Sequence, residues 1–561
     1  MFKTKFLIIF SLLLALLMLF SCGNISIDGG DTTESQISQE SAKETVAETQ
    51  PSNPYAPTAG ATFEGYANYQ LVSKLEQMPR TFEAWVKIDG KTGKSNIFGN
   101  MYEEGTNAFS FRVRDGIPTL FLAARSESVA FNKAKVTKDE WTHVTITADV
   151  EAKKFHCYVN GELKESKSMI GGHITAIDNI EFNSETNTHM IMLGGIGSYS
   201  EGSKDTFCGE LGSFAAYSDV RSAEEIAKDY QSFSNPDHNG LMVAFVLDES
   251  GTAVYRDLSR NSNNFTMGGY DYLTSEDLQL PADYDYSVIV VGDTQGLSAR
   301  SNTNGYYGLY DWIAANVEPK KIEAVIGVGD ITNNNTDVQW ERAVIAFEKL
   351  KGKVDHFPVI GNHDVSVEYG GDNPVLYDRY FPFEQNENNG SFDGTMKSYF
   401  YRFEMQGEKF LFLGMGYSPK QADVDWAKTV LDSHPDYNVI LSCHGYLDAD
   451  GSLLKNAGAP LLREQLVLEY SNIVLVLCGH MHNENVLLYT EKREDGTTVQ
   501  ALLTDPQEYN YDVNIGIATA LYFARGGETV YVANHLVGYD AYLGTESVRS
   551  FELDLVHNRA K

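Results

Sequence analysis

The order of apolar and polar positions divides the chain into segments of different character. Lys3 and Lys5 precede an almost unbroken apolar run from Phe6 to Phe20. A membrane-spanning helix needs about twenty apolar residues, so this shorter run with its basic start predicts a secretory signal over residues 1–21. Residues 22–60 are mostly small and polar, with almost no large apolar side chains. Such a segment cannot bury a core, and we expect a disordered tether.

Residues 61–235 carry the alternating pattern of half-buried strands. TFEAWVKI and WTHVTITADV alternate apolar and polar positions, and Asn160-Gly161 separates two further alternating segments, which favours a hairpin. Helical periodicity is confined to SAEEIAKDY, at residues 222–230. The pattern predicts an all-β sandwich over residues 61–235, followed by a connecting segment at residues 236–283.

From residue 284 to residue 561, apolar strands alternate with amphipathic helices. Strands are predicted for YSVIVVGD, IEAVIGVGD, HFPVIGNHD, NVILSCHG and NIVLVLCGHMH, and helices for YYGLYDWIAANV, VQWERAVIAFEKL and LLREQLVLEY. Turns at Asp495-Gly496 and Gly526-Gly527 predict antiparallel hairpins near the end. The expected fold of this segment is α/β with mixed sheets flanked by helices, so the whole chain is multidomain.

Composition narrows the classes of function. The formal charge of the 561-residue chain is −33. Because a surface this acidic repels polyanions, no nucleic acid is expected as a partner. The five cysteines do not form a disulfide framework. Cys157 and Cys208 either pair or stay free, and Cys443 and Cys478 are predicted to be small core residues.

The end of the first apolar run carries a targeting signal. Residues 19–22, LFSC, resemble a bacterial lipobox. The resemblance implies that Cys22 becomes the lipidated amino terminus and anchors the protein at the extracellular face of the bacterial cell membrane. The alternative is a plain cleaved signal that leaves a free cysteine. Either process places the mature protein outside the cytoplasm.

Five of the predicted strands after residue 284 end in side chains that can bind metals. The carboxyl ends of the strands of an α/β sheet share one edge, where ligands bind, so we expect these side chains to converge. Oxygen and imidazole donors without cysteine suit Mn, Fe or Zn. The strand-end residues are Asp293 with Gln295, Asp330, Asn362 with His363 and Asp364, His444, and His480 with His482.

The motifs GD-x-Q, GD-x-x-N, GNHD, H and GHMH, in this order, resemble those of the calcineurin-like metallophosphoesterases. The resemblance runs from about Asp285 to the carboxyl terminus. It implies two divalent metal ions, of which Mn, Fe and Zn are the candidates. The implied ligands are Asp293, Gln295 and His482 for one metal, Asn362, His444 and His480 for the other, and Asp330 for both.

The same resemblance implies a chemistry and a substrate class. A water activated between two divalent ions attacks a phosphate ester, and the ions neutralise the charge that develops on the phosphoryl group. His363 acts on the leaving group, and Asp364 orients it. The irregular segment 365–396 follows His363 and is expected to form one wall of the substrate site. Within it, Tyr377, Arg379 and Tyr380 either contact substrate or pack as a surface loop.

Gln295 departs from the commonest pattern of the family, which has histidine at this position. One branch of the superfamily also carries Asp-x-Gln, so the departure does not imply a dead enzyme. A glutamine carbonyl oxygen is a harder and weaker donor than an imidazole nitrogen. We therefore expect this first site to bind its metal more loosely and to favour Mn or Mg over Zn.

FEAWVKI, WTHVTIT followed by CYVNGEL, and GELGSFAAYSDVRSAEEI resemble segments of laminin-G and concanavalin-like jelly-roll domains. Domains of this family often bind glycans or neighbouring domains, so the resemblance implies a glycan or cell-surface ligand for the sandwich. We interpret Trp85 and Trp141 as core residues and not as a sugar platform. Residues 240–267 look like the opening strand region of that same family. They supply either a permuted strand or a degraded second copy, and both alternatives stay open.

The leading hypothesis is an extracellular, membrane-tethered hydrolase of phosphate mono- or diesters with an accessory β-sandwich. The first alternative is a surface glycan-binding or adhesion protein that keeps the phosphoesterase fold as a scaffold. The full set of ligand residues argues against this alternative, because a scaffold has no need of buried ligands. A second alternative, an extracellular nuclease, conflicts with the acidic surface.

Overall fold

The computed structural model describes residues 55–64, 69–71, 75, 77–90, 96–100, 108–180, 191–194, 207–232, 237–247, 252–365 and 374–556. The predicted signal, Cys22 and most of the predicted tether lie outside these residues. A search of the described helices finds none that combines the length and the apolar character needed to cross a membrane.

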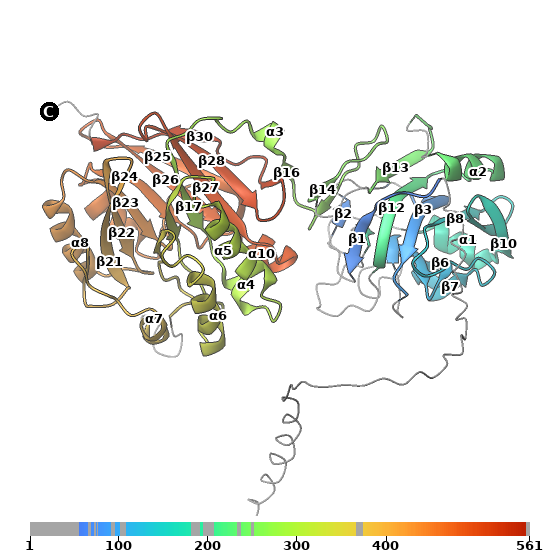
Figure 1. Ribbon diagram of the computed structural model, residues 1–561, viewed down its shortest axis with the longest axis horizontal. Helices are drawn as coiled ribbons and strands as arrows, with labels where there is room; N and C mark the ends of the chain where they lie inside the picture. Colours follow the sequence, from blue (N-terminus) through green and yellow to red (C-terminus); the bar gives the residue numbers. More distant parts are fainter. Residues whose placement is uncertain are drawn as a thin grey trace, which may run out of the picture. The chain divides into compact units, whose positions relative to one another are not determined.

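Two antiparallel sheets form the amino-terminal sandwich (Figure 1). The first sheet has the order β1 (Ala61–Glu64), β12 (Cys208–Tyr217), β3 (Thr81–Ile88), β8 (Thr142–Asp149), β9 (Lys154–Val159) and β10 (Glu162–Ser168), and β13 (Leu241–Val246) also pairs with β12. The second has the order β14 (Val254–Tyr255), β15 (Phe265–Met267), β2 (Tyr69–Leu71), β11 (Met192–Leu193), β4 (Asn96–Gly99), β5 (Phe109–Arg114), β6 (Ile117–Leu122) and β7 (Glu127–Ala130).

Aromatic side chains from both sheets fill the sandwich core. Phe82 on β3, Phe98 on β4 and Phe214 on β12 are fully buried, and the rings of Phe98 and Phe214 stack with centroids 4.5 Å apart. Trp85 is buried against Tyr230 and outside this cluster, whereas Trp141 is only half-buried, so the prediction that both are core residues holds for Trp85 alone. Rings of this size supply most of the apolar area that holds two sheets together.

Among its described residues, the sandwich carries three short helices: η1 (Ala123–Arg125), α1 (Gly171–Asp178) and α2 (Ala223–Gln231). The sequence predicts α2, which begins with a capping box in which the Ser222 hydroxyl accepts from Glu225 N–H at 3.3 Å. It does not predict α1. Cys157 and Cys208 are not joined by a disulfide in the structure, so the paired alternative does not hold.

The connecting segment contributes strands to both sheets. β13 pairs with β12 beyond the stretch that β1 covers, and β15 pairs with β2 in the other sheet. This is the arrangement of a permuted strand that completes the sandwich. β16 (Tyr272–Leu273) and the short helix α3 (Ser275–Leu278) follow, and β16 pairs with β29 of the next domain. The exact domain boundaries stay predictions.

The carboxyl-terminal domain contains two mixed sheets. The β17 sheet has the order β16, β29 (Tyr542–Leu543), β28 (Thr529–Leu536), β27 (Ile517–Ala524), β17 (Tyr286–Val291), β18 (Ile322–Gly327) and β19 (Asp355–Phe357), with β30 (Ser550–Glu552) on β28. The β23 sheet has the order β20 (Asn389–Ser391), β21 (Ser398–Met405), β22 (Glu408–Met415), β23 (Asn438–Cys443), β24 (Ile473–Cys478), β26 (Thr498–Asp505) and β25 (Asn483–Lys492).

Alternate side chains of each strand face different layers. Val288 and Val290 on β17 share one buried cluster with Phe410 and Phe412 on β22, so this cluster fills the space between the two sheets. Ile289 faces the opposite way, into a cluster with the helices that cover the β17 sheet. The continuous apolar runs of these strands follow from burial on both faces.

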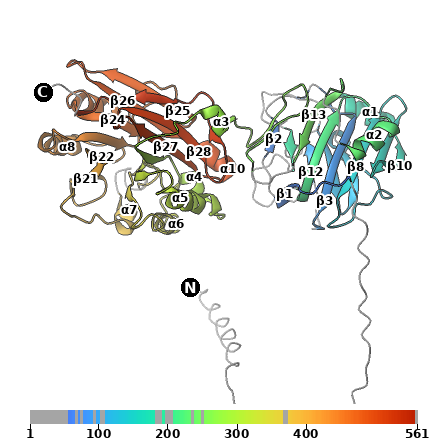
Figure 2. The same ribbon diagram turned by 45° about the horizontal axis from the view of Figure 1, so that its top comes forward.

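The helices form the outer layers (Figures 1 and 2). Those beside the β17 sheet are α4 (Gln295–Ala299), α5 (Asn304–Asn316), α6 (Asp337–Phe347) and α7 (Val375–Tyr380). Those beside the β23 sheet are α8 (Gln421–Ser433), α9 (Ala459–Leu462) and a π-helical turn, η3 (Arg463–Val467). A further helix, α10 (Gln507–Val513), follows β26. The predicted fold class, an all-β sandwich followed by a mixed α/β domain, is confirmed.

The segment after His363 packs against α6 where it is described; residues 366–373 lie outside the described part. Tyr377 is buried, and its hydroxyl donates to Pro358 O at 3.3 Å. Arg379 and Tyr380 both reach Asp337 on α6, at 3.0 and 2.8 Å. These contacts favour the packing alternative for the three side chains over contact with substrate.

Candidate metal centre

The carboxyl ends of strands from both sheets meet at one place. Asp293 follows β17 and Asp330 follows β18, which are parallel neighbours in the β17 sheet. His444 follows β23 of the other sheet. All three side chains are buried, and one ligand atom from each lies within 4.8 Å of the others. Two carboxylates and an imidazole at this spacing form a group that could hold a metal ion.

Asp330 and His444 lie at the centre of the group. His444 Nε2 is 3.3 Å from Asp330 Oδ2 and 2.9 Å from Asn362 Oδ1. His444 Nδ1 is 2.9 Å from Val328 O. A carbonyl oxygen only accepts, so Nδ1 carries a proton, and Nε2 is the nitrogen that can bind a cation.

The two histidines of GHMH lie in different surroundings. The His480 ring is half-buried, 4.8 Å from the ring of His444, and its backbone N–H donates to Asp293 Oδ2 at 3.0 Å. His482 is 43 % exposed, at the rim, and its Nδ1 is 3.4 Å from Glu508 Oε1. The structure thus brings His480 to the centre, whereas His482 faces an exposed carboxylate.

His363 and Asp364 follow Asn362 and contact different groups. His363 Nδ1 is 2.7 Å from Asn333 O, and its backbone N–H donates to Asp330 Oδ1 at 2.9 Å. The fully buried Asp364 carboxylate accepts from the backbone N–H groups of Gly361, Ile331 and Thr332 at 2.8–3.0 Å. The carbonyl group of Asn333 therefore orients the His363 imidazole in this structure. The Asp364 carboxylate instead fixes the backbone at Gly361 and at Ile331 and Thr332.

Gln295 is buried next to Asp330. Its Nε2 donates to Asp330 Oδ2 at 3.1 Å and to the side-chain oxygen of Gln507. Its carbonyl oxygen is buried and has no hydrogen-bond partner. The glutamine thus lies within the group of expected ligands and presents an unused oxygen.

Sequence reasoning missed three residues of this site. Asp505 ends β26, and its Oδ2 is buried without a partner. Gln507 follows it and contacts Gln295. The half-buried ring of Tyr417 lies 5.7 Å from the rings of both His444 and His480. TVQALLTD is an apolar run that ends in a carboxylate, so the strand-end rule could have found Asp505, whereas no pattern marks the other two.

Glycine precedes two of the ligand residues because a side chain would occupy the place of a carboxylate. A Cβ on Gly361 would lie 2.1 Å from Asp330 Oδ1, and one on Gly479 would lie 2.2 Å from Asp293 Oδ1. Asp330 and His480 themselves have φ of +47° and +72°. Left-handed backbone at non-glycine residues is costly and is concentrated at functional sites.

The carboxylates of the site repel one another. Burial, with Asp505 and Asp330 nearby, raises the pKa of Asp293 well above its usual range. Burial likewise raises the pKa of Asp505 to about 6, against the opposing effect of His482. Burial also acts to raise the pKa of Asp330, but His444 outweighs it and the net shift is downward. Buried carboxyl groups in this arrangement are neutralised either by protons or by a bound cation.

Divalent metal ions fit this requirement. Three buried oxygens here, Asp293 Oδ1, Gln295 Oε1 and Asp505 Oδ2, have no hydrogen-bond donor. Carboxylate and amide oxygens with imidazole nitrogens are donors that Mn and Fe, and also Zn, accept. The chemistry of the donor set therefore supports the metal that the sequence predicts, without selecting its identity.

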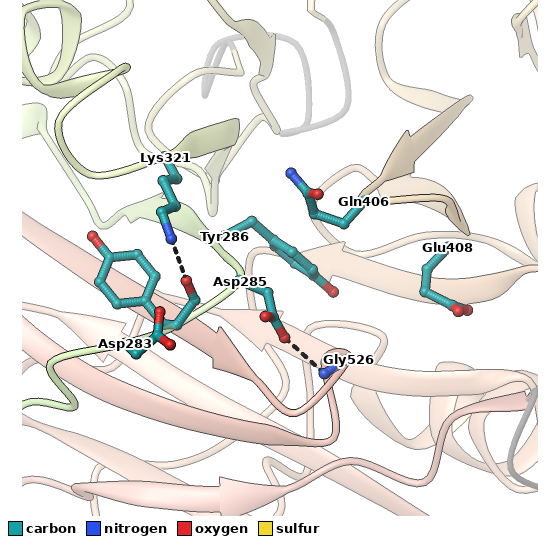
Figure 3. Close-up of a pocket in the computed structure, with 8 residues that line it drawn as sticks. Asp283, Asp285, Tyr286, Lys321, Gln406, Glu408 and Gly526 are labelled. Carbon is teal, nitrogen blue, oxygen red and sulfur yellow. Dashed lines mark hydrogen bonds between the residues drawn. The ribbon is translucent and has the colours of Figure 1, made fainter.

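A separate hollow of about 500 Å³ lies at the other end of β17 (Figure 3). Two of its charged side chains, Lys321 and Asp285, already have local partners. Lys321 Nζ donates to Tyr284 O at 2.6 Å, and Asp285 Oδ2 accepts from Gly526 N–H at 2.7 Å. It lies near the first residue of the strand, whereas Asp293 follows the last, so it takes no part in the metal centre.

Comparison with known proteins agrees with the two-domain architecture. The sequence model of the calcineurin-like phosphoesterases matches residues 286–484, and that of the concanavalin A-like lectin/glucanase superfamily matches residues 64–227. An uncharacterized Bacillus subtilis protein, YvnB, is 28% identical over 208 residues, which are 36% of this chain and 16% of that protein. The chain thus spans about a sixth of the length of this relative.

Two solved structures are similar to separate parts of the chain. A dimetal phosphatase from Danio rerio is 12% identical, with a TM-score of 0.32, and the alignment covers 48% of this chain and 99% of the phosphatase chain. The CBM40 of the Ruminococcus gnavus IT-sialidase is 18% identical, with a TM-score of 0.24, and the alignment covers 31% of this chain and 97% of the CBM40 chain. By its sequence motifs and its family matches, the carboxyl-terminal part of this chain is a calcineurin-like phosphoesterase domain, and it follows a concanavalin A-like β-sandwich.

Proposed function

We propose that the chain hydrolyses phosphate mono- or diesters with two divalent metal ions held where the strands of its two carboxyl-terminal sheets end. One observation carries the proposal: Asp293, Asp330 and His444 come from three separate strands and place their ligand atoms within 4.8 Å of one another. The match of residues 286–484 to the phosphoesterase family supports the reaction class.

The residues divide into two ligand sets that share one carboxylate. Asp293, Gln295 and His482 would hold one ion, Asn362, His444 and His480 would hold the other, and Asp330 would contact both. When bound, two divalent ions supply an acidified water and positive charge next to a phosphoryl group. The buried positions of Asp293 and Asp330 exclude bulk water from this charge and so strengthen its effect.

His363 is placed to move a proton. Its Nδ1 is 2.7 Å from Asn333 O, an acceptor, so Nδ1 keeps its hydrogen. Nε2 is then the nitrogen that can protonate the departing alkoxide. Asp364 holds the turn that carries His363 through the backbone N–H groups of Gly361, Ile331 and Thr332.

The test is hydrolysis by the full chain without its signal, supplied with Mn²⁺. The substrates are p-nitrophenyl phosphate and bis(p-nitrophenyl) phosphate, which separate monoesterase from diesterase activity. Wild type and the control Asp355→Asn, at the opposite end of β19, are expected to be active and to lose activity with a chelator. Activity that survives both His363→Ala and Asp330→Ala would overturn the proposal.

We also propose that the β-sandwich binds a glycan or another cell-surface ligand and brings the enzyme to its substrate. The match of residues 64–227 to a lectin and glucanase superfamily supports this role. Retention of the protein on immobilised bacterial cell-wall polysaccharides would test it. Equal retention of a protein that starts at residue 268, after the last strand of the sandwich, would contradict it.

The location outside the cytoplasm, with a lipid at Cys22, rests on the sequence of residues 1–22. Metabolic labelling with radioactive palmitate in a bacterial host would test it. We expect label in the wild-type protein and none in Cys22→Ser. Label in both proteins, or in neither, would contradict the lipid anchor.

A further inference from the structure

The segment from Asp505 to Gln507 lies at the edge where the expected metal ligands converge. Asp505 is the last residue of β26, which runs parallel to β24, the strand that leads to His480. Gln507 is the first residue of α10. Both side chains are buried, and the motifs of the sequence assign neither of them a role.

Gln507 fixes the orientation of the Gln295 side chain. Gln295 Nε2 donates one hydrogen to Asp330 Oδ2 at 3.1 Å and the other to Gln507 Oε1. A carboxylate accepts but does not donate, so the amide nitrogen must face Asp330. Both amide hydrogens are then used, and the carbonyl oxygen of Gln295 remains buried with no donor.

Asp505, at the end of β26, supplies a second buried oxygen without a hydrogen-bond partner. Its Oδ1 accepts from Gln507 N–H at 3.1 Å, whereas Oδ2 is buried and has no donor. Asp505 is among the groups that raise the pKa of Asp293, and Asp293 Oδ1 also lacks a donor. Neighbouring buried carboxyl groups either share a proton or hold a cation, and a bound cation would use both unused oxygens.

We propose that Asp505 and Gln507 complete the metal site of Gln295, Asp505 as an additional carboxylate ligand and Gln507 as the positioning residue that turns the Gln295 oxygen toward the ion. This inference rests on the proposed function, because it assumes that the site holds metal. Asp505 supplies the negative charge that offsets the weak amide donor. The site is then rich in oxygen, and oxygen donors favour Mn²⁺ and Mg²⁺ over Zn²⁺.

The first experiment titrates metal-free protein with Mn²⁺ by calorimetry and counts bound metal by mass spectrometry. Wild type and the charge-matched control Asp355→Asn are expected to bind two ions. Asp505→Asn keeps the shape of the side chain and removes its charge. We expect it to weaken one of the two Mn²⁺ sites by at least about 10–100-fold, the effect of losing a supporting group, and to leave the other site unchanged.

Thermal unfolding separates ligation from a purely structural role. Without metal, Asp505→Asn removes repulsion between buried carboxylates, so its melting temperature should be higher than that of wild type. With Mn²⁺, the increase in melting temperature should be smaller than in wild type, because less metal is bound. A variant that unfolds at lower temperature without metal but keeps both Mn²⁺ sites would show that Asp505 is only structural, and would overturn the proposal.

A double-mutant cycle tests the positioning role of Gln507. Gln507→Met preserves length and removes the acceptor, so it should weaken Mn²⁺ binding at one site in wild type. In a Gln295→His background there is no amide to orient, and the same change should have little effect. Equal losses in the two backgrounds would overturn the positioning role. Absence of Mn²⁺ binding by the wild type would instead contradict the proposed function itself.

Discussion

His444 Nε2 lies 2.9 Å from Asn362 Oδ1, and this contact joins the two sheets of the phosphoesterase domain. His444 follows β23, whereas Asn362 follows β19 of the β17 sheet. The expected ligands of one metal ion therefore already touch across the boundary between the sheets. A cation at this point would be held by both halves of the domain at once.

Replacement of this histidine should remove one ion. We expect His444→Ala to bind one Mn²⁺ where wild type binds two, and to lose at least about 100-fold in kcat, since each ion contributes several kcal/mol to stabilisation of the transition state. Metal counting and steady-state kinetics check the two effects. A variant with both ions still bound would contradict the assignment of His444 as a ligand.

The contribution of His363 should depend on the leaving group. For an alkyl phosphate, whose alkoxide needs a proton, His363→Asn is expected to lower kcat by about 10²–10⁴-fold. For p-nitrophenyl phosphate the loss should be much smaller, because nitrophenolate departs without a proton. Equal losses with both substrates would show that His363 acts on binding or charge, and not on the departing oxygen.

Gly479 should not tolerate a methyl group. A Cβ there would lie 2.2 Å from Asp293 Oδ1, so Gly479→Ala should displace this carboxylate and lower metal affinity and activity together. Gly308→Ala in α5 is the control, because a Cβ at that position meets no atom within 4 Å. Alanine at a helical position stabilises by up to about 1 kcal/mol, so the control should unfold at a slightly higher temperature. Wild-type Mn²⁺ affinity in Gly479→Ala would contradict this explanation.

Acid should destabilise the domain partly through His535. Burial lowers the pKa of this histidine to about 3, and its Nε2 lies 2.7 Å from the hydroxyl oxygen of Tyr522. An unfolded histidine has a pKa of about 6.5, so the stability from the neutral buried ring is present above about pH 6.5 and is lost as the pH falls toward 3. The loss is about 1.4 kcal/mol per pH unit in this window.

The variant His535→Gln keeps an acceptor for Tyr522 and does not titrate. Between pH 7 and pH 5 its free energy of unfolding should therefore fall by about 2 kcal/mol less than that of wild type. Urea unfolding of metal-free protein at the two pH values measures this difference. If the free energy of unfolding falls equally in the two proteins between pH 7 and pH 5, His535 is excluded as a source of the acid sensitivity.

The sequence predicts most of the fold because long apolar runs leave few alternatives. The strands around Val290 and Val476 are buried on both faces, and their runs are correspondingly continuous. The strand predicted for HFPVIGNHD ends earlier, at Phe357, because Pro358 has no backbone N–H to continue the ladder. Helix α1 was missed because it begins with two glycines and has no apolar stripe.

The site was predictable where a residue ends a strand and not where it reaches the site by packing. The strand-end rule brings together Asp293, Asp330 and His444, as the structure does. The place of Gln507 depends on how α10 packs after β26, which no short pattern encodes. The roles of all these residues in metal binding and catalysis stay predictions, as does the weak metal binding expected from Gln295.

The two glutamines that touch in the metal centre, Gln295 and Gln507, are 212 positions apart in the chain. Residues from both sheets, and from several points between these two positions, contribute to the same group. A fragment of the gene that omits either end of this interval would therefore lose part of the group. Insertions are tolerated at the ends of such a unit and in its surface loops, and in this chain the β-sandwich lies at one of these ends.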